Sequence, residues 1–329
     1  MRIVVVGATG NVGSSLVERL SQDGRVTAVL GLARRAPAIE LPKVEWEAAD
    51  ARTADLARLF AGADAVVALS WLIQPSHRPD ILSSVNVAGT ERILDAVSGA
   101  GVPALVYASS VGAYSRKDGP APVDESWPTE GIPSCPYSRD KAAVERMLDR
   151  FQQRHPEVRT VRLRPALVFK RGSAAEITRY FMGWPALARR LPSRLPVAPM
   201  PQGLTMQCVH SHDLAAAYDA AIFSDADGAF NIAAEPVIDA ERIRSVYGVR
   251  PVPLPAAGVR AVMAAAWHLR LQPTDPSWLD MALGVPVMDC GRAHEVLGWR
   301  PEHTSIEALS ELYGGIRDQA SLPTPSLHG

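Results

Sequence analysis

The chain has 329 residues, of which 47% are hydrophobic and 21% are charged, and its formal net charge is −1. These values are typical of a globular protein with a sizeable core, and the near-neutral charge argues against a nucleic-acid partner. No apolar run reaches the roughly 18 residues of a membrane span, and the three cysteines have no disulfide or zinc spacing, so we expect a cytoplasmic protein without membrane contacts.

Short apolar runs alternate with helical patterns through the first half of the chain. Strands are expected at 3–6, 26–32, 44–47, 65–69, 104–108 and 160–163, and helices after residue 10 and at 55–61, 85–98 and 134–153. Such alternation is typical of parallel strands with helices on both faces. The pattern therefore predicts an α/β protein with a Rossmann-type, doubly wound parallel sheet.

The periodicity weakens after about residue 165. A helix is expected at 177–187, an extended loop with four prolines at 191–202, a strand at 230–232, and helices at 213–223, 256–270 and 305–317. We expect a smaller, discontinuous C-terminal lobe that holds the substrate. The expected division is a dinucleotide-binding domain at 1–165 to which 205–235 returns, a substrate lobe at 166–204 and 236–318, and a tail at 319–329.

Three glycines follow the first strand and open the first helix. Gly7, Gly10 and Gly13 would allow a tight turn, a close approach to a pyrophosphate, and close packing of helix on strand. An ordinary glycine-rich turn is the alternative. The other loop residues expected at the cofactor are Thr9, Asn11 and Val12.

The end of the second strand favours NADP over NAD. Arg34 and Arg35 stand where NAD-specific sheets place a carboxylate for the ribose hydroxyl, and guanidinium groups suit a phosphate. NAD remains the alternative, with the arginines then solvated. Asp50 either accepts from the adenine amino group or caps a turn, and further cofactor contacts are expected at Ala51 and Leu69.

Tyr137 and Lys141 are four residues apart on a predicted helix, so their side chains share a face. A phenol has a pKa of about 10, and a neighbouring ammonium lowers it, so the pair could move a proton to or from an alcohol oxygen. Ser109 and Ser110 follow a strand at the carboxyl edge of the sheet, where open sheets bind ligands. The alternative for the pair is a solvated helix face.

Together these motifs resemble the extended short-chain dehydrogenase/reductases, the epimerase/dehydratase superfamily of NAD(P) enzymes. The resemblance covers roughly residues 1–235, resumes at 289, and is weak between 236 and 285. It is carried by residues 7–13, Asp50, 86–90, 107–114, 136–141 and 297–301.

The resemblance implies a role for each residue of the predicted site. Tyr137 would be the catalytic acid or base, Lys141 would lower its pKa and hold the nicotinamide ribose, and Ser110 would orient the substrate oxygen. Asn86 would support the cofactor site, and Pro165 would lie beside the nicotinamide. The resemblance also implies a homodimer formed through helices at about 85–98 and 135–153.

Two departures from the family pattern narrow the reaction. Val111 follows Ser110 where sugar-nucleotide dehydratases carry an Asp-Glu pair, which argues against dehydration. Trp71 follows the fourth strand and would either line an apolar substrate pocket or belong to the core. The expected substrate contacts are Trp71, Ser109 and Val111. His210 and His212 alternate, but no third ligand cluster follows them, so no metal is expected and Asp213 is interpreted as a helix cap.

Three functions fit these residues. The leading hypothesis is an NAD(P)H-dependent carbonyl reductase or alcohol dehydrogenase that acts on a small apolar substrate. The alternative is a nucleotide-sugar epimerase with a tightly bound cofactor, whose diphosphate contacts would be Arg179, Arg189, Arg190 and Arg194. A regulatory protein that binds the dinucleotide without catalysis is the third, and the presence of both Tyr137 and Lys141 argues against it.

Overall fold

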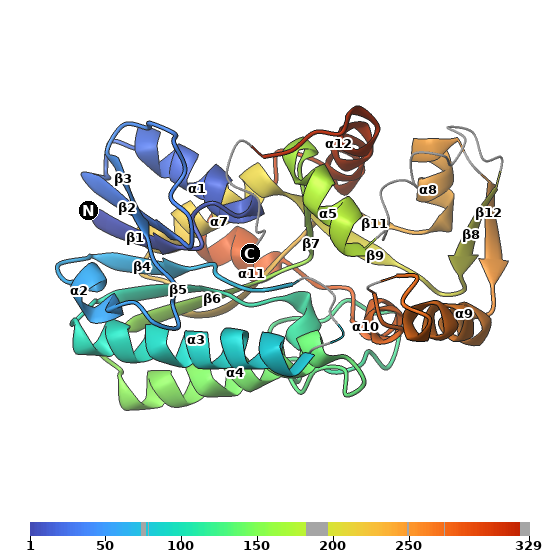
Figure 1. Ribbon diagram of the computed structural model, residues 1–329, viewed down its shortest axis with the longest axis horizontal. Coiled ribbons are helices and arrows are strands. Elements are labelled where there is room, and N and C mark those ends of the chain that lie inside the picture. Colours follow the sequence, from blue (N-terminus) through green and yellow to red (C-terminus); the bar gives the residue numbers. More distant parts are fainter. Residues whose placement is uncertain (74–76, 78, 182–196, 249, 273, 323–329) are drawn as a thin grey trace.

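A seven-stranded parallel sheet forms the centre of the computed structural model, which describes residues 1–73, 77, 79–181, 197–248, 250–272 and 274–322 (Figure 1). The strand order β10-β6-β5-β4-β1-β2-β3 confirms the predicted doubly wound sheet. The strands are β1 Arg2–Val6, β2 Ala28–Ala33, β3 Val44–Ala48, β4 Ala65–Ala68, β5 Ala104–Ala108, β6 Arg159–Pro165 and β10 Gly228–Ile232.

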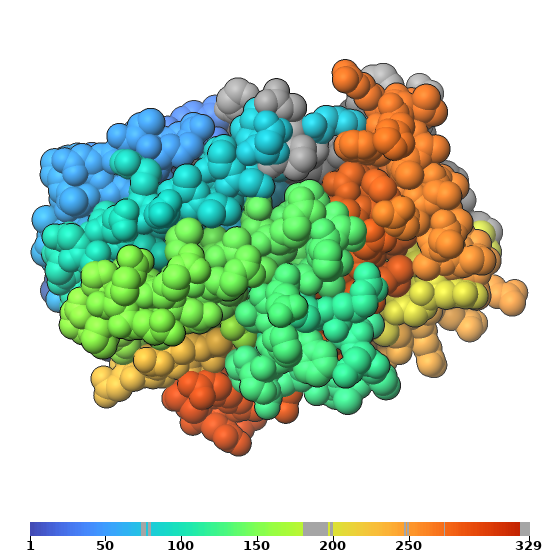
Figure 2. Space-filling model, turned by 90° about the horizontal axis from the view of Figure 1, so that it is seen from below, coloured from blue at the N-terminus to red at the C-terminus, as the bar shows by residue number. Residues whose placement is uncertain are grey.

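Both faces of this sheet are buried, which explains why β1 is apolar at consecutive positions. Ile3 and Val5 join one hydrophobic cluster, and Val4 and Val6 join the other. The first face is covered by α1 Asn11–Gln22, α7 Ser211–Phe223 and α11 Gly291–Val296, and the second by α2 Leu56–Phe60, α3 Pro79–Gly99 and α4 Pro136–Arg154. Seen from below, α3 and α4 form the outer layer of the second face (Figure 2).

Helix α3 begins six residues earlier than predicted, because apolar periodicity begins only at Val85 although Pro79 can already occupy a first helical position. Helix α4 likewise has a proline in its first turn, directly after its N-cap residue Cys135. Its boundaries agree with the prediction within two residues.

The remaining elements form two small sheets with helices around them. Strands β7 Leu167–Phe169, β9 Met206–His210 and β11 Ala234–Ile238 form one sheet, and β8 Val197–Pro201 and β12 Arg250–Leu254 form the other. The helices are α5 Ala174–Phe181, α8 Ala240–Tyr247, α9 Ala256–His268, α10 Ser277–Gly284 and α12 Ser305–Asp318. Among the helices in the described part of the chain, none combines the length and apolarity needed to cross a bilayer.

The prediction of an extended loop at 191–202 is wrong for its second half. Residues 197–201 form β8, which pairs in parallel with β12. Prolines alternate with other residues in both strands, as at Pro199 and Pro251, so the intervening residues keep their N–H groups for pairing in a two-stranded edge ribbon. Residues 191–196 and the predicted continuation of α5 to 187 lie outside the described residues, as do 323–329 of the predicted tail.

Segments from the second half of the chain complete the main sheet. Helix α7 packs against α1, and β10 forms the edge strand beside β6. Strand β9, by contrast, pairs with β7 and β11 in the three-stranded sheet, and we call this sheet, the β8–β12 pair and the helices around them the small lobe. Helix α11 also lies in the main core, together with Trp299, although the sequence placed this stretch in the lobe.

Candidate active site

The glycine loop between β1 and α1 contains two glycines that the protein's own packing requires. Gly7 has a φ of +88°, and a Cβ atom on it would lie 2.8 Å from the backbone nitrogen of Ser70. A Cβ atom on Gly13 would lie 2.3 Å from the carbonyl oxygen of Gly7. These two positions allow the tight turn and the close packing of helix on strand that the sequence predicts.

Gly10 differs, because nothing inside the protein excludes a side chain there. Its φ is −73°, and a Cβ atom would meet only the Gly7 carbonyl oxygen, at 3.5 Å. Gly10 is the N-cap of α1, and no side chain forms a capping hydrogen bond there, so the N–H groups of the first turn remain available to a ligand at the positive end of the helix dipole. The loop therefore fits a pyrophosphate that approaches the backbone at Gly10.

A pair of alanine substitutions separates these two kinds of glycine. We expect Gly10→Ala to melt like the wild type but to bind NADPH or NADH about tenfold more weakly or worse, because the methyl group occupies the approach of the pyrophosphate. Gly13→Ala should instead lose about 1–3 kcal/mol of stability, since the new methyl group would collide with backbone atoms of Gly7 and Ala8 that cannot move aside. Thermal melting and fluorescence titration of the reduced cofactor measure both, and wild-type affinity in Gly10→Ala would contradict the fit.

Asn11, predicted at the cofactor, uses its amide side chain within the protein. Its Nδ2 donates to the Val168 carbonyl at 3.0 Å, and its backbone carbonyl accepts from Lys170 Nζ at 2.8 Å. Thr9 is buried in the loop, and Val12 packs against the main core. The side chains of Asn11 and Val12 thus anchor the loop to the rest of the fold.

The edge of the sheet at β2 and β3 carries the residues predicted to select the cofactor. Arg34 and Arg35 are exposed directly after β2. Asp50 caps the turn that follows β3, one of the two roles open to it: it accepts from the Arg52 backbone N–H at 2.9 Å and pairs with the Arg52 guanidinium at 2.7 Å. The hydrogen bond from Arg52 lowers the pKa of Asp50, and the charge of Arg34 adds to the effect.

Two further predicted cofactor residues have backbone roles in the structure. The Ala51 carbonyl accepts from Arg92 Nε at 3.0 Å, and the Leu69 N–H donates to the Val6 carbonyl at 2.8 Å, which extends β4 alongside β1. Both hold the carboxyl edge of the sheet in place.

Helix α4 and the end of β5 bring the predicted catalytic residues together. The Tyr137 hydroxyl hydrogen-bonds with the Ser110 side chain, whose Oγ accepts from the Gly112 N–H at 3.0 Å. Lys141 lies one turn further along α4, and its Nζ donates to the Ala108 carbonyl at 2.8 Å. All three side chains therefore meet at the carboxyl end of β5, on the edge of the sheet at which open α/β sheets bind ligands.

The electrostatics of this pair differ from the expectation that Lys141 lowers the pKa of Tyr137. Burial instead raises the pKa of Tyr137 to about 12. The Lys141 ammonium points elsewhere: it lies 3.6 Å above the ring of Trp71, and burial lowers its pKa to about 7. The expectation is wrong for this geometry because the loss of solvent dominates over any attraction between the two groups.

Two tryptophans flank the Tyr137 ring. The Trp71 ring centroid lies 6.1 Å away, with the planes at 81°, and the Trp278 centroid lies 5.3 Å away, with the planes at 34°. Trp278 is on α10, as is Met281, whose sulfur lies 4.0 Å from Cys135 Sγ. The sequence reasoning missed Trp278 and Met281, because no local motif marks α10 and only the docking of the small lobe brings it to Tyr137.

The remaining predicted residues support the site from outside. Asn86 accepts from the Leu72 N–H at 2.8 Å and donates to the Leu72 carbonyl at 3.0 Å. Its amide group therefore holds the backbone next to Trp71. Pro165 is buried at the end of β6, and Val111 packs in a small cluster with Tyr114 and Ala166.

Ser109, predicted to contact a substrate, uses its hydroxyl proton within the protein, because it donates to Glu145 Oε1 at 2.5 Å. Glu145 is buried on α4, one turn beyond Lys141, and it also pairs with Arg162 and Arg164 of β6, each at 2.9 Å. Burial alone would raise the pKa of Glu145, but the hydrogen bonds and charges of Arg164 and Arg162 outweigh it and lower the pKa to about 2. This network fixes α4 to β6 and to the end of β5, and the sequence reasoning missed it.

Comparisons with known proteins agree with this geometry. A sequence profile of the NAD dependent epimerase/dehydratase family matches residues 3–233. The chain is similar to the sterol-4-alpha-carboxylate 3-dehydrogenase, decarboxylating, of Saccharomyces cerevisiae, with 37% identity over 100 residues that cover 30% of this chain and 29% of that protein. It is also similar to the UDP-glucose 4-epimerase of Mycolicibacterium smegmatis, with 34% identity over 163 residues that cover 46% of this chain and 51% of the other.

The chain thus spans about half the length of the mycobacterial relative and less of the yeast one. Among solved structures, MoeE5 in complex with UDP-glucuronic acid and NAD has 22% identity and a TM-score of 0.72, and the superposition covers 97% of this chain and 100% of that one. This likeness extends the agreement in fold to the small lobe.

Proposed function

Because the chain belongs to the NAD-dependent epimerase/dehydratase family, we propose that it is an NAD(P)H-dependent reductase acting on the carbonyl group of a small apolar substrate, or the corresponding alcohol dehydrogenase. The observation that carries the proposal is the aromatic wall around the proton-transferring residue. Trp71 and Trp278 flank Tyr137, and Met281 lies nearby, so a substrate carbonyl that reaches the hydroxyl does so among apolar side chains.

Each residue of the site then has a defined task. When bound, the nicotinamide ring supplies or accepts the hydride. Tyr137 gives its proton to the substrate oxygen, and Ser110, which already hydrogen-bonds with Tyr137, steadies that oxygen. Lys141 would hold the nicotinamide ribose through its amino group, and Asn86 holds the backbone after β4 through its two hydrogen bonds with Leu72.

A screen of purified protein tests this function. The cofactor that the protein retains is identified first, and apolar carbonyl compounds and UDP-sugars are then compared by the absorbance of the reduced nicotinamide. We expect oxidation of added NADPH with one or more carbonyl compounds and none with UDP-sugars. Retained NAD together with failure of every carbonyl compound would refute the reductase.

A nucleotide-sugar epimerase is the second candidate, and the similarity to the mycobacterial UDP-glucose 4-epimerase favours it. The same Ser110, Tyr137 and Lys141 would serve, with a cofactor that stays bound. Of the arginines predicted to contact a diphosphate, Arg179 lies on α5, and the other three lie outside the described residues. Conversion of a UDP-sugar without added cofactor and without accumulation of reduced nicotinamide would identify this activity.

We also propose that NADP is the preferred cofactor, through Arg34. Both Arg34 and its neighbour Arg35 are exposed after β2, and residues 32–35 contain no carboxylate for a ribose hydroxyl. We expect Arg34→Ala to weaken NADPH binding about 10- to 100-fold and to leave NADH binding nearly unchanged, since charge-assisted hydrogen bonds to the phosphate are lost. Fluorescence titrations with both cofactors measure the ratio. An equal loss for both would show that Arg34 does not contact the phosphate.

We also propose a homodimer formed through α3 and α4, as the family resemblance implies. The two helices form one outer face (Figure 2), and a groove of about 450 Å³ between them has Leu94 and Met147 in its lining. Light scattering should give twice the chain mass, and Met147→Glu should reduce it to the monomer mass. A monomeric wild type would refute the dimer.

A further inference from the structure

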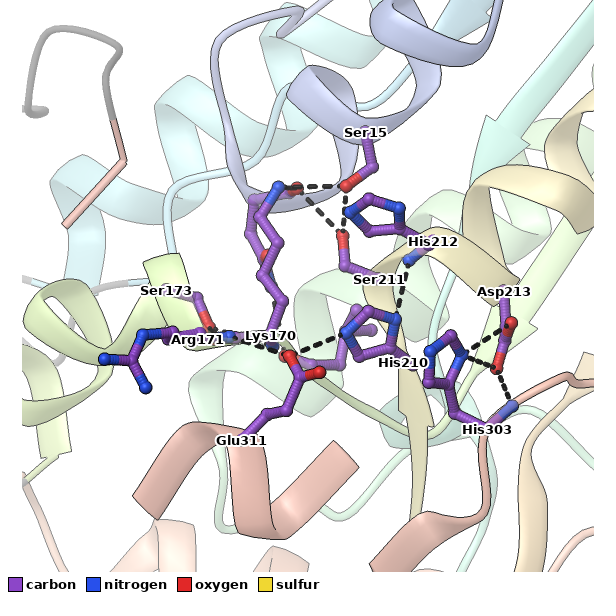
Figure 3. Close-up of polar contacts among 12 residues, drawn as sticks. Ser15, Lys170, Arg171, Ser173, His210, Ser211, His212, Asp213, His303 and Glu311 are labelled. Atoms are coloured by element: carbon purple, nitrogen blue, oxygen red, sulfur yellow. Dashed lines mark hydrogen bonds and ion pairs between the residues drawn. The ribbon is translucent and has the colours of Figure 1, made fainter. Parts of the chain in front are cut away.

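Three side chains with metal-binding atoms meet between α7 and α12, away from Tyr137 (Figure 3). His210 is the last residue of β9, His303 precedes α12, and Glu311 lies on α12. One ligand atom from each lies within 4.8 Å of the other two. His210 Nε2 is 3.1 Å from Glu311 Oε2, and the ring centroids of His210 and His303 are 4.1 Å apart.

We propose that His210, His303 and Glu311 bind a divalent transition-metal ion of the zinc type. Two imidazoles and one carboxylate form a donor set that such ions prefer, whereas Mg²⁺ and Ca²⁺ prefer oxygen ligands. His210 and Glu311 are already at about the separation of two ligands on one zinc ion. Half-buried His303 and exposed Glu311 leave the fourth position open to water and give the ion a path of entry.

Asp213 orients His303 as outer partners orient the histidines of metal sites. The buried carboxylate lies 3.2 Å from His303 Nδ1 through both of its oxygens, and it accepts from the His303 backbone N–H at 2.9 Å. The proton of the neutral ring is therefore held on Nδ1, and Nε2 keeps its lone pair. In a metal-ligating histidine, the ring nitrogen that does not bind the metal usually donates its proton to a carboxylate or a similar acceptor.

His210 must give up two hydrogen bonds when the ion binds, and the ion replaces the one to Glu311. Its Nδ1 accepts from the His212 backbone N–H at 3.3 Å, which caps α7, so the ring proton is on Nε2 and is donated to Glu311. Ligation through Nε2 moves that proton to Nδ1 and removes the long cap bond. The change alters no net charge, and the lost bond is weak by its length.

An ion at this position would connect α12, the last helix, to α1, the helix that follows the glycine loop. Ser211, next to His210, donates to the Asn11 carbonyl at 2.9 Å and lies 3.0 Å from Ser15 on α1. Lys170 contacts the same Ser15 and the same carbonyl. Because His303 precedes α12 and Glu311 lies near the middle of that helix, the ion would hold α12 against His210 at the start of α7 and, through Ser211, against α1, and so stabilise the whole chain (Figure 3).

Metal titration of tag-free, EDTA-treated and desalted protein tests the site. Co²⁺ alone should give visible ligand-field absorption that saturates at one ion per chain. Zn²⁺ at about 100 times its dissociation constant should raise Tm by about 5 °C, and Mg²⁺ should not. Absence of the Co²⁺ spectrum together with an unchanged Tm in Zn²⁺ would overturn the proposal.

Variants assign the ligands. His303→Ala and Glu311→Gln should each lose the Co²⁺ spectrum and most of the Zn²⁺ effect, measured against the metal-free Tm of the same variant, because His303→Ala also removes a partner of the buried Asp213. The matched control is His212→Ala, because His212 is exposed and its ring lies 5.1 Å from that of His210 outside the ligand set. It should behave as the wild type. Undiminished Co²⁺ binding by both ligand variants, or an equal loss in His212→Ala, would refute this assignment.

Discussion

Replacing Tyr137 by Phe is expected to lower kcat for carbonyl reduction about 10²- to 10⁴-fold, the usual contribution of a positioned proton donor. The ring and its packing between Trp71 and Trp278 remain, so the fold and the affinity for the cofactor should change little. Steady-state assays of the absorbance of the reduced nicotinamide give kcat, and thermal melting and cofactor titration are the controls. Full turnover in the variant, with cofactor still bound, would show that Tyr137 is not the proton donor, whereas cofactor binding by the wild type without any turnover would favour the regulatory protein.

The direction of the Tyr137 pKa shift adds a pH signature. Because burial raises this pKa to about 12, the hydroxyl keeps its proton at neutral pH, as a group that donates a proton to a carbonyl oxygen during reduction must. We expect the reductive rate to show no pH dependence due to Tyr137 between about pH 6 and 9, because the hydroxyl stays protonated throughout this range. The oxidative rate should rise with pH as the phenol becomes easier to deprotonate. If the reductive rate changed with pH near neutrality, and this change disappeared in Tyr137→Phe, the bound cofactor would lower the pKa of Tyr137 again.

The parts of the site that the sequence predicted are those set by local chain geometry. Gly7 and Gly13 are dictated by contacts within one strand-turn-helix unit, and Ser110, Tyr137 and Lys141 sit at the ends of elements whose apolar patterns are strong. A parallel sheet brings these ends to one edge whatever the loops do. Motif and pattern were therefore sufficient to bring the three side chains together.

The parts that were missed depend on burial and on contacts between distant segments. Trp278 reaches Tyr137 only because the small lobe docks, and α10 carries no local pattern that announces this. His303 and Glu311 follow His210 by more than ninety residues, so a search for nearby ligands could not find them. The Tyr137 pKa was predicted in the wrong direction because a sequence shows which charges are near but not how much solvent is lost.

Glu145 would be interpreted from sequence as a solvated charge on an amphipathic helix, yet its loss is expected to have the largest effect on stability. Glu145→Gln leaves Arg162 and Arg164 buried without their shared counter-charge, and breaking such a buried pair typically costs about 3–5 kcal/mol. For a chain of this length we expect thermal denaturation to give a Tm lower by roughly 6–10 °C. Urea denaturation in the same buffer measures the loss in the free energy of unfolding.

Asp149→Asn is the matched control, because Asp149 lies one turn further along α4 and pairs with the same Arg162 at 2.7 Å. Its side chain is 55% exposed, so water replaces the lost pairing and the cost should stay below about 1 kcal/mol. Acid provides the second check. The pKa of Glu145 is lowered from 4.5 to about 2, so its stabilisation is complete above pH 4.5 and is lost as the pH falls toward 2. The difference in stability between wild type and Glu145→Gln should shrink over that interval, and a constant difference would show that the carboxylate charge does not hold the catalytic helix to the sheet.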